Sequence, residues 1–227
     1  MKQNNVLKES LGNFLRNAYD LLALNWLWLL CSLPVVTIGP ATTALYAVTL
    51  KLAEEEPVSL VKDFFKAFKE EFLGSLAMGL LVLVLTVVAL GDAWFAVQQT
   101  GAMQVLFLVV AFLVGLAALT LLTFGFALQA RFRNGLKKHI TNAFSLVFVA
   151  PGKMLRLMLV LLLPVLLALC LPLTAVKAIG FLYIMYGVSL PIYVNSRTLR
   201  YVFRKAGEEA QHFVPPASDE QKRDMES

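Results

Sequence analysis

The stretch of sequence that decides the fold reads Asn25-Trp-Leu-Trp-Leu-Leu-Cys-Ser-Leu-Pro34-Val-Val-Thr-Ile-Gly39-Pro40-Ala-Thr-Thr-Ala-Leu-Tyr46. It lies within residues 21–50, which contain no Asp, Glu, Lys or Arg. Pro34 removes a helix donor and clashes with the preceding turn, and Gly39-Pro40 breaks a helix where a new one can begin. The stretch therefore predicts a helix to about Leu33, a bend, and a second helix from about Pro40 to Ala53.

Further charge-free runs extend this pattern along the chain. They predict spans at about 73–91, 104–128, 156–175 and 178–196. About 20 apolar residues cross a hydrocarbon core of about 30 Å, and a backbone in lipid satisfies its own hydrogen bonds as a helix. The expected fold class is all-α: a polytopic transmembrane helical bundle over residues 1–205, with a broken first segment, followed by a polar tail at 206–227.

The composition supports the same class. Of the 227 residues, 59% are hydrophobic and 15% are charged, whereas soluble domains average about 45–50% apolar and about 25% charged residues. A small folded sphere cannot hide so much apolar surface from water. The composition excludes a disordered chain, a disulfide scaffold and an ordinary soluble enzyme.

Lys and Arg residues predict the orientation. None lies between residues 92 and 104. Because basic residues in short loops favour the cytoplasm, the loops 51–71 and 131–156 and the C-terminus are expected there. If residues 21–50 form a hairpin that returns to its own side of the membrane, Lys177 is the one basic residue outside the cytoplasm. If residues 21–50 cross the membrane once, the three basic residues before residue 20 are outside the cytoplasm as well. The hairpin fits the charge rule better, but its halves are short for full crossings, so the side of the N-terminus stays open.

Amphipathic segments form a second pattern. Over residues 59–72, four phenylalanines recur at helical spacing while lysines occupy the other face: Phe64, Phe65, Phe68 and Phe72 against Lys62, Lys66 and Lys69. Weaker copies are found at 6–19, with Leu7, Leu11, Phe14 and Ala18, and at 135–148, with Leu136, Ile140, Phe144 and Val147. Such helices either lie in the lipid interface or pack on the bundle, and the sequence leaves both alternatives open.

Uncharged polar and helix-breaking residues provide the candidate contact or solute-path positions. These are Asn25, Pro34, Thr37, Gly39, Pro40, Thr43, Tyr46, Tyr186, Tyr193 and Asn195. Broken helices expose backbone that can line a site. The alternative, which we favour, is that these residues make hydrogen bonds between helices, each contributing roughly 0.6 kcal/mol. Ser75 with Gly79 has the small-residue spacing that allows close helix packing.

Motifs for catalysis are missing from the sequence. No ionisable residue lies mid-span, which disfavours proton-coupled transport. There is no P-loop and no Gly-x-Ser-x-Gly, and the isolated His139 and His212 do not form a zinc pattern. We therefore expect no enzyme activity, no catalytic residue, no metal and no cofactor. Nucleic-acid motifs are also absent, so the expected partner is the lipid bilayer; self-association stays open.

Three motifs carry a resemblance to a known family. They are the stretch from Leu24 to Tyr46, Asp63-Phe-Phe-Lys-Ala-Phe-Lys-Glu-Glu-Phe72, and Ala130-Arg-Phe-Arg-Asn134 followed by Thr141-Asn-Ala-Phe144. Over about residues 8–205 the chain resembles the YesL-like family of bacterial integral membrane proteins, whose activity is not established. The resemblance implies a multi-pass protein of the bacterial cell membrane.

The same resemblance implies a functional context. By gene neighbourhood, YesL-like proteins look like companions of carbohydrate uptake systems and two-component sugar sensors. We expect an accessory membrane protein that assists such a system through contacts with subunits of an importer or a sensor kinase. The alternative is a small facilitator or channel for a neutral solute such as a sugar. The solute and the partner are not predicted.

Overall fold

The structure is a computed structural model that describes residues 18–149, 152, 155–160, 180 and 185–212. The described residues contain helices and no strand, which confirms the predicted all-α bundle. A first helix, Ala18–Cys31, precedes the labelled elements: η1 (Val35–Thr37), α2 (Ile38–Ala53), α3 (Leu60–Glu70), α4 (Phe72–Gln98), α5 (Ala102–Thr120), η2 (Leu121–Gly125), α6 (Phe126–Arg131), α7 (Leu136–Val149) and α10 (Ser189–His212).

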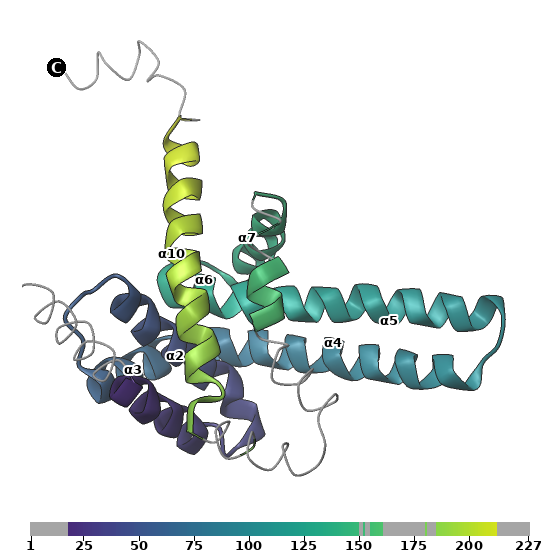
Figure 1. Ribbon diagram of the computed structural model, residues 1–227, viewed down its shortest axis with the longest axis horizontal. Coiled ribbons are helices and arrows are strands. Elements are labelled where there is room, and N and C mark those ends of the chain that lie inside the picture. The colour runs from purple at the N-terminus through teal and green to yellow at the C-terminus, as the bar shows by residue number, and fades with distance from the viewer. Residues whose placement is uncertain (1–17, 150–151, 153–154, 161–179, 181–184, 213–227) are drawn as a thin grey trace, which may run out of the picture.

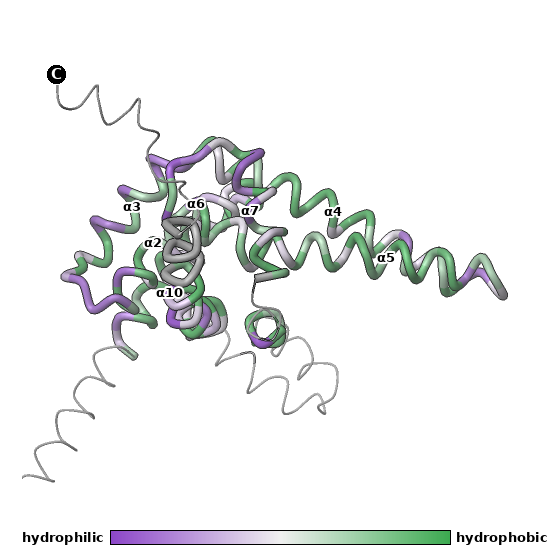
Figure 2. Tube along the Cα trace, turned by 90° about the horizontal axis from the view of Figure 1, so that it is seen from above, coloured by the Kyte–Doolittle hydropathy of each residue, from purple (hydrophilic) through white to green (hydrophobic). Residues whose placement is uncertain are grey.

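Two parts can be distinguished in the arrangement of these helices. The hairpin of α4 and α5 extends away from the remaining helices, while α2, α3, α6 and the start of α10 gather at its other end (Figure 1). We call this gathered part the base. Gly101, with φ 67°, lies in the turn that joins α4 to α5, a left-handed conformation that glycine adopts without strain. Figure 2 shows that the hairpin is mainly hydrophobic along its length.

The predicted bend in the first apolar segment is confirmed. The first helix ends at Cys31, and the Thr37 hydroxyl lies 2.6 Å from the Cys31 carbonyl and 2.7 Å from that of Pro34. The second helix begins at Ile38, slightly before the predicted Pro40. The proline is accepted there because the first N–H groups of a helix have no acceptor within it.

The other predicted spans need some correction. The prediction of 73–91 is too short, because α4 continues through Asp92 to Gln98. The prediction of 104–128 is placed correctly, but η2 interrupts it as a π-helical turn. The span 156–175 and the segment 6–19 lie largely outside the described residues; of the span 178–196 the structure describes residues 180 and 185–196, and its last eight residues form the start of α10. Helix α10 continues to His212, so it extends into the predicted polar tail.

Within the part of the chain that the structure describes, three helices are long and apolar enough to cross a membrane: Val35–Ala53, Phe72–Gln98 and Ala102–Arg131. The first helix, Ala18–Cys31, is shorter. With 27 residues, α4 is about 40 Å long at 1.5 Å per residue, which exceeds a hydrocarbon core of about 30 Å. These dimensions are those of a membrane protein.

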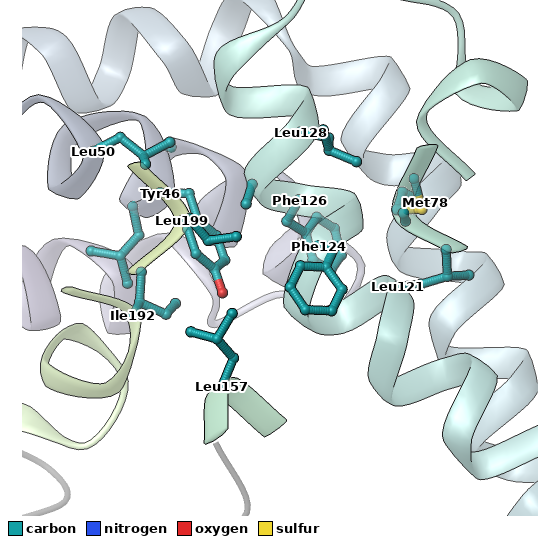
Figure 3. Packing of buried hydrophobic residues seen from close by; sticks show 14 of the residues in the cluster. Tyr46, Leu50, Met78, Leu121, Phe124, Phe126, Leu128, Leu157, Ile192 and Leu199 are labelled. Carbon is teal, nitrogen blue, oxygen red and sulfur yellow. The ribbon is translucent and has the colours of Figure 1, made fainter. Parts of the chain in front are cut away.

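The buried core lies in the base and not along the hairpin. Side chains from α2, η2, α6 and α10 meet there, and Tyr46 lies among Phe124, Leu157 and Leu199 (Figure 3). Tyr46, Phe124 and Leu199 are completely buried. The core therefore joins segments from both halves of the chain around the second half of the broken segment.

Candidate functional site: the hydrogen-bond cluster around α2

The closest helix contact of the base involves Gly39. A Cβ atom built on Gly39 would overlap the carbonyl oxygen of Ser75 and lie 3.2 Å from the Cα atom of Gly79. The predicted pair of small residues on α4 therefore packs within the chain, against the first turn of α2. Such small residues let helix backbones approach each other closely in a membrane.

Hydroxyl groups continue the same contact along α2. The Ser75 hydroxyl donates to Thr43 Oγ1 at 2.7 Å, and the Trp28 indole donates to Thr42 Oγ1 at 3.1 Å. Further along α2, Thr49 and Ser196 hydroxyls are 2.9 Å apart. Together with Tyr46 and its partner, these groups form what we call the α2 cluster. It connects α2 with the first helix, α4 and α10.

Tyr46 connects α2 with the π-helical turn η2. Its hydroxyl donates to the Thr123 carbonyl at 3.3 Å, while the Thr123 hydroxyl bonds back to Leu119 at 2.7 Å. A π-helical turn disturbs the regular backbone hydrogen bonding of a helix. Tyr46 therefore provides a donor to a buried carbonyl at this irregular position.

Asn25 caps a helix that lies far away in the sequence. Its Oδ1 accepts hydrogen bonds from the backbone N–H groups of Val188 and Ser189, both at 3.1 Å. These groups are at the start of α10, where a helix lacks internal acceptors. Because Asn25 is completely buried, its amide fixes the first helix to α10.

Asn195 differs from the other members of this region. It is completely buried and lies beside the Tyr46 hydroxyl. Neither of its amide atoms makes a hydrogen bond of good geometry, and the same holds for the Ser189 hydroxyl. Buried polar groups usually have partners, so Asn195 is a position in the base where an additional polar group would be stabilised.

The remaining predicted positions do not join one site. Pro34 is exposed at the bend, and Thr37 holds that bend. Tyr186 and Tyr193 are half-buried, and within the described residues neither phenol makes a hydrogen bond. The structure thus brings together Asn25, Gly39, Pro40, Thr43, Tyr46 and Asn195 in the base, and it leaves the other four candidates outside the α2 cluster.

The phenylalanines of α3 divide between two environments. Phe64 is completely buried in the core cluster, and its ring stacks on Phe68 with centroids 6.4 Å apart. Phe72 contacts Phe68 at 5.5 Å, whereas Phe65 is 40% exposed. One edge of α3 therefore packs on the bundle and the other is exposed, and the position of this helix in the lipid interface stays a prediction.

Charged residues gather where α2, α3 and α6 meet. Arg131 pairs with Glu54 at 2.6 Å, Arg133 with Glu70 at 3.0 Å, and Lys51 with Asp63 at 3.5 Å. Arg200 on α10 donates to the Ala53 carbonyl at 2.6 Å. We call this part the charged end of the base; it fixes the C-terminus of α2 to its neighbours.

The sequence reasoning missed several buried polar residues, among them His139 and Gln129. Of the apolar face predicted for 135–148, Leu136, Ile140 and Val147 pack half-buried against the core and Phe144 is exposed. The buried positions of α7 are His139, Ala143 and Leu146. Burial lowers the pKa of His139, although a hydrogen bond with the Asn134 backbone opposes this effect. Gln129 is 3% exposed. The i, i+4, i+7 spacing of His139, Ala143 and Leu146 is the signal that could have identified the buried face of α7.

Comparison with known proteins gives one match. The family described as "Protein of unknown function, DUF624" matches residues 21–93, which include the broken first segment, α3 and most of α4. No curated protein matches the chain, and no solved structure does. Among the described residues, no group of three or more His, Cys, Asp or Glu could hold a metal ion. Over residues 21–93, the chain is similar to a family whose function is unknown.

Proposed function

We propose that this chain is an accessory protein of the bacterial cell membrane that acts by binding other membrane subunits of a carbohydrate importer or a sugar sensor. The observation that carries the proposal is the α2 cluster. Its polar groups bond to other helices of the same chain, as Ser75 does with Thr43 and Thr49 with Ser196. A base held together in this way supports a binding role more than a polar conduit.

The proposed contact surfaces are the exposed apolar positions. On α3 and the start of α4, Val61, Phe65 and Leu73 are exposed. The α4–α5 hairpin exposes many more apolar side chains, such as Val87 and Phe112. Membrane helices associate through such surfaces when shapes fit. The carbohydrate context itself comes from the YesL-like resemblance of the sequence motifs, two of which lie within the matched residues.

The charged end supports the proposed orientation. It contains Lys51, Arg131 and Arg133, whereas the hairpin tip around Gly101 has no Lys or Arg. By the positive-inside rule the charged end faces the cytoplasm. With this orientation α3 is at the cytoplasmic surface, within reach of soluble domains of an importer or sensor.

Site-specific crosslinking in native membranes tests the proposal. A photo-crosslinking residue at Phe65 and another at Val87 should each capture subunits of an importer or sensor kinase, identified by mass spectrometry. Thr141, which is exposed on α7, is the control position and should capture neither. Recovery of lipid alone, or of the same proteins from all three positions, would contradict the proposal.

A facilitator for a neutral solute is the second candidate, and Asn195 favours it. A buried amide with two unpaired atoms beside the Tyr46 hydroxyl could hydrogen-bond a passing hydroxyl group. Purified protein in liposomes should then release a sugar without added energy, and Asn195→Leu should abolish the release. Equal release from liposomes with the variant, or none with the native protein, would rule out this candidate.

A further inference from the structure

A small pocket lies at the charged end, between α2, α3 and α6. Its volume is about 190 Å³. The helices that form it gather at the base (Figure 1). Its polar lining consists of Lys51, Asp63, Lys66, Glu70, Glu71, Gln129, Arg131 and Arg133. The α2 cluster does not share any of these side chains, so the pocket is a separate feature of the base.

Most charges in this pocket neutralise one another. Lys51 pairs with Asp63, Arg133 with Glu70, and Arg131 with Glu54 just outside the lining. Among the described residues, Lys66 and Glu71 form no ion pair. The pocket therefore offers one cation and one carboxylate that have no ion-pair partner in the described part of the chain.

Gln129 adds an unpaired acceptor to the pocket wall. The residue is 3% exposed, and its Oε1 atom has no hydrogen-bond partner. A buried acceptor without a donor is unfavourable, and buried polar atoms usually have a partner. Gln129 lines the pocket, and a ligand with an N–H group that reaches Oε1 would supply the missing donor.

The size and charge of the pocket restrict the ligand. Its volume of about 190 Å³ corresponds to about six waters of liquid, whereas sites for drug-sized ligands occupy about 300–1,000 Å³. A simple anion would meet the carboxylates of Asp63, Glu70 and Glu71, and a simple cation would meet four basic side chains. A small zwitterion fits the unpaired cation and carboxylate together.

We propose that this pocket binds a phosphoethanolamine group. The phosphate accepts hydrogen bonds from Lys66, and the ammonium donates to Glu71 and to Gln129 Oε1, since an ammonium has three donors and no acceptor. Two sources carry this group: the headgroup of phosphatidylethanolamine and soluble esters such as glycerophosphoethanolamine. The proposal does not depend on the proposed accessory function.

Lipid competition tests the ligand. The full chain is placed in nanodiscs that contain phosphatidylethanolamine and phosphatidylcholine, and bound lipid is measured by native mass spectrometry. Phosphatidylcholine has the same charges but no N–H group, so phosphatidylethanolamine should be preferred by roughly tenfold, the effect of one hydrogen bond to a charged group. Calorimetry with glycerophosphoethanolamine identifies the source of the phosphoethanolamine group. If the protein binds this soluble ester but does not prefer phosphatidylethanolamine over phosphatidylcholine, the ligand is a free ester and not a lipid headgroup. No preference and no ester binding would overturn the proposal.

Matched variants test the residues. Lys66→Ala and Glu71→Gln should each weaken binding about tenfold, while Lys62→Ala and Glu56→Gln, which change exposed residues outside the pocket, should not. Gln129→Leu should reduce the preference for phosphatidylethanolamine over phosphatidylcholine without abolishing it, because the hydrogen bond to Glu71 remains. If Gln129→Leu fails to fold, the two charge variants still decide, and equal binding by them and by their controls would contradict the proposed site.

Discussion

The base around α2 and the outer part of the α4–α5 hairpin are both apolar, but they bury different fractions of their side chains. In α2, 61% of the most apolar window is buried, compared with 11% in α4 and 17% in the α5–α6 segment. Thr42, Thr43 and Thr49 are buried in the base, whereas Val97 and Phe112 of the hairpin are 79% and 69% exposed. The α2 segment is the less apolar of these helices, and its small and hydroxyl-bearing residues mark it as the helix that packs against protein.

The two helices of the hairpin pack along each other, but most of their side chains face outward. Phe95 stacks on Phe107 with ring centroids 6.2 Å apart, and a Cβ atom on Gly115 would lie 3.8 Å from Ala89 Cβ. An apolar surface of this extent needs a nonpolar environment. We therefore expect substitutions in the base to destabilise the fold and matched substitutions on the hairpin to have little effect.

The largest expected difference is between two glycines. Gly39→Ala should destabilise the protein by about 3 kcal/mol, because the new methyl group overlaps backbone and not a flexible side chain. Gly91→Ala on the hairpin has nothing within 4 Å of its new Cβ and should be neutral or stabilising by up to about 1 kcal/mol. Reversible unfolding in mixed micelles measures both variants. A smaller loss for Gly39→Ala than for Gly91→Ala would mean that the helices do not cross as described.

The next effect concerns the cap that joins the first helix to α10. Asn25→Ala removes the acceptor of the Val188 and Ser189 N–H groups and should cost about 1–2 kcal/mol. Asn142→Ala, at an exposed position of α7, serves as the control and should change stability by less than about 0.5 kcal/mol. The same unfolding assay compares them, and equal stabilities would argue against capping by Asn25.

Tyr46→Phe should have a smaller effect. It removes the hydrogen bond to the Thr123 carbonyl, which contributes about 0.6–1 kcal/mol in a membrane bundle. Tyr19 is 69% exposed on the first helix, so Tyr19→Phe should not change the unfolding midpoint. A loss in Tyr19→Phe as large as that in Tyr46→Phe would show that the buried hydroxyl makes no particular contribution.

The smallest effect is a dependence on pH through His139. Burial lowers the pKa of this histidine in the folded protein, so the unfolded chain binds a proton first as the pH falls. Stability should be constant above the ordinary histidine pKa of about 6.5 and should decrease as the pH falls below it. The slope of stability between pH 7 and 5 is expected to be shallower in His139→Asn. An unchanged slope in that variant would show that another group is responsible.

Particular residues show how far the sequence predicts the structure. Pro34 and Gly39-Pro40 located the bend because they act on the local backbone, and the charge-free runs located α4 and α5. Asp92 did not end α4, since one charge near the end of a long helix is compatible with helix geometry. The π-helical turn η2 and the burial of His139 and Gln129 depend on packing between distant segments, which local periodicity does not contain. Asn25 was among the predicted candidates, but its role as a cap for α10 required the tertiary structure.

The environment of the hairpin is the central claim, and site-directed spin labelling tests it most directly. In a background with Cys31→Ala and Cys170→Ala, a nitroxide is attached at Val87→Cys on the exposed face of α4, or at Lys62→Cys on the lysine face of α3, and the protein is reconstituted in liposomes. The label at residue 87 should collide readily with oxygen and be protected from a water-soluble nickel chelate, whereas the label at residue 62 should show the reverse. Free access of the nickel chelate to residue 87 would contradict the account.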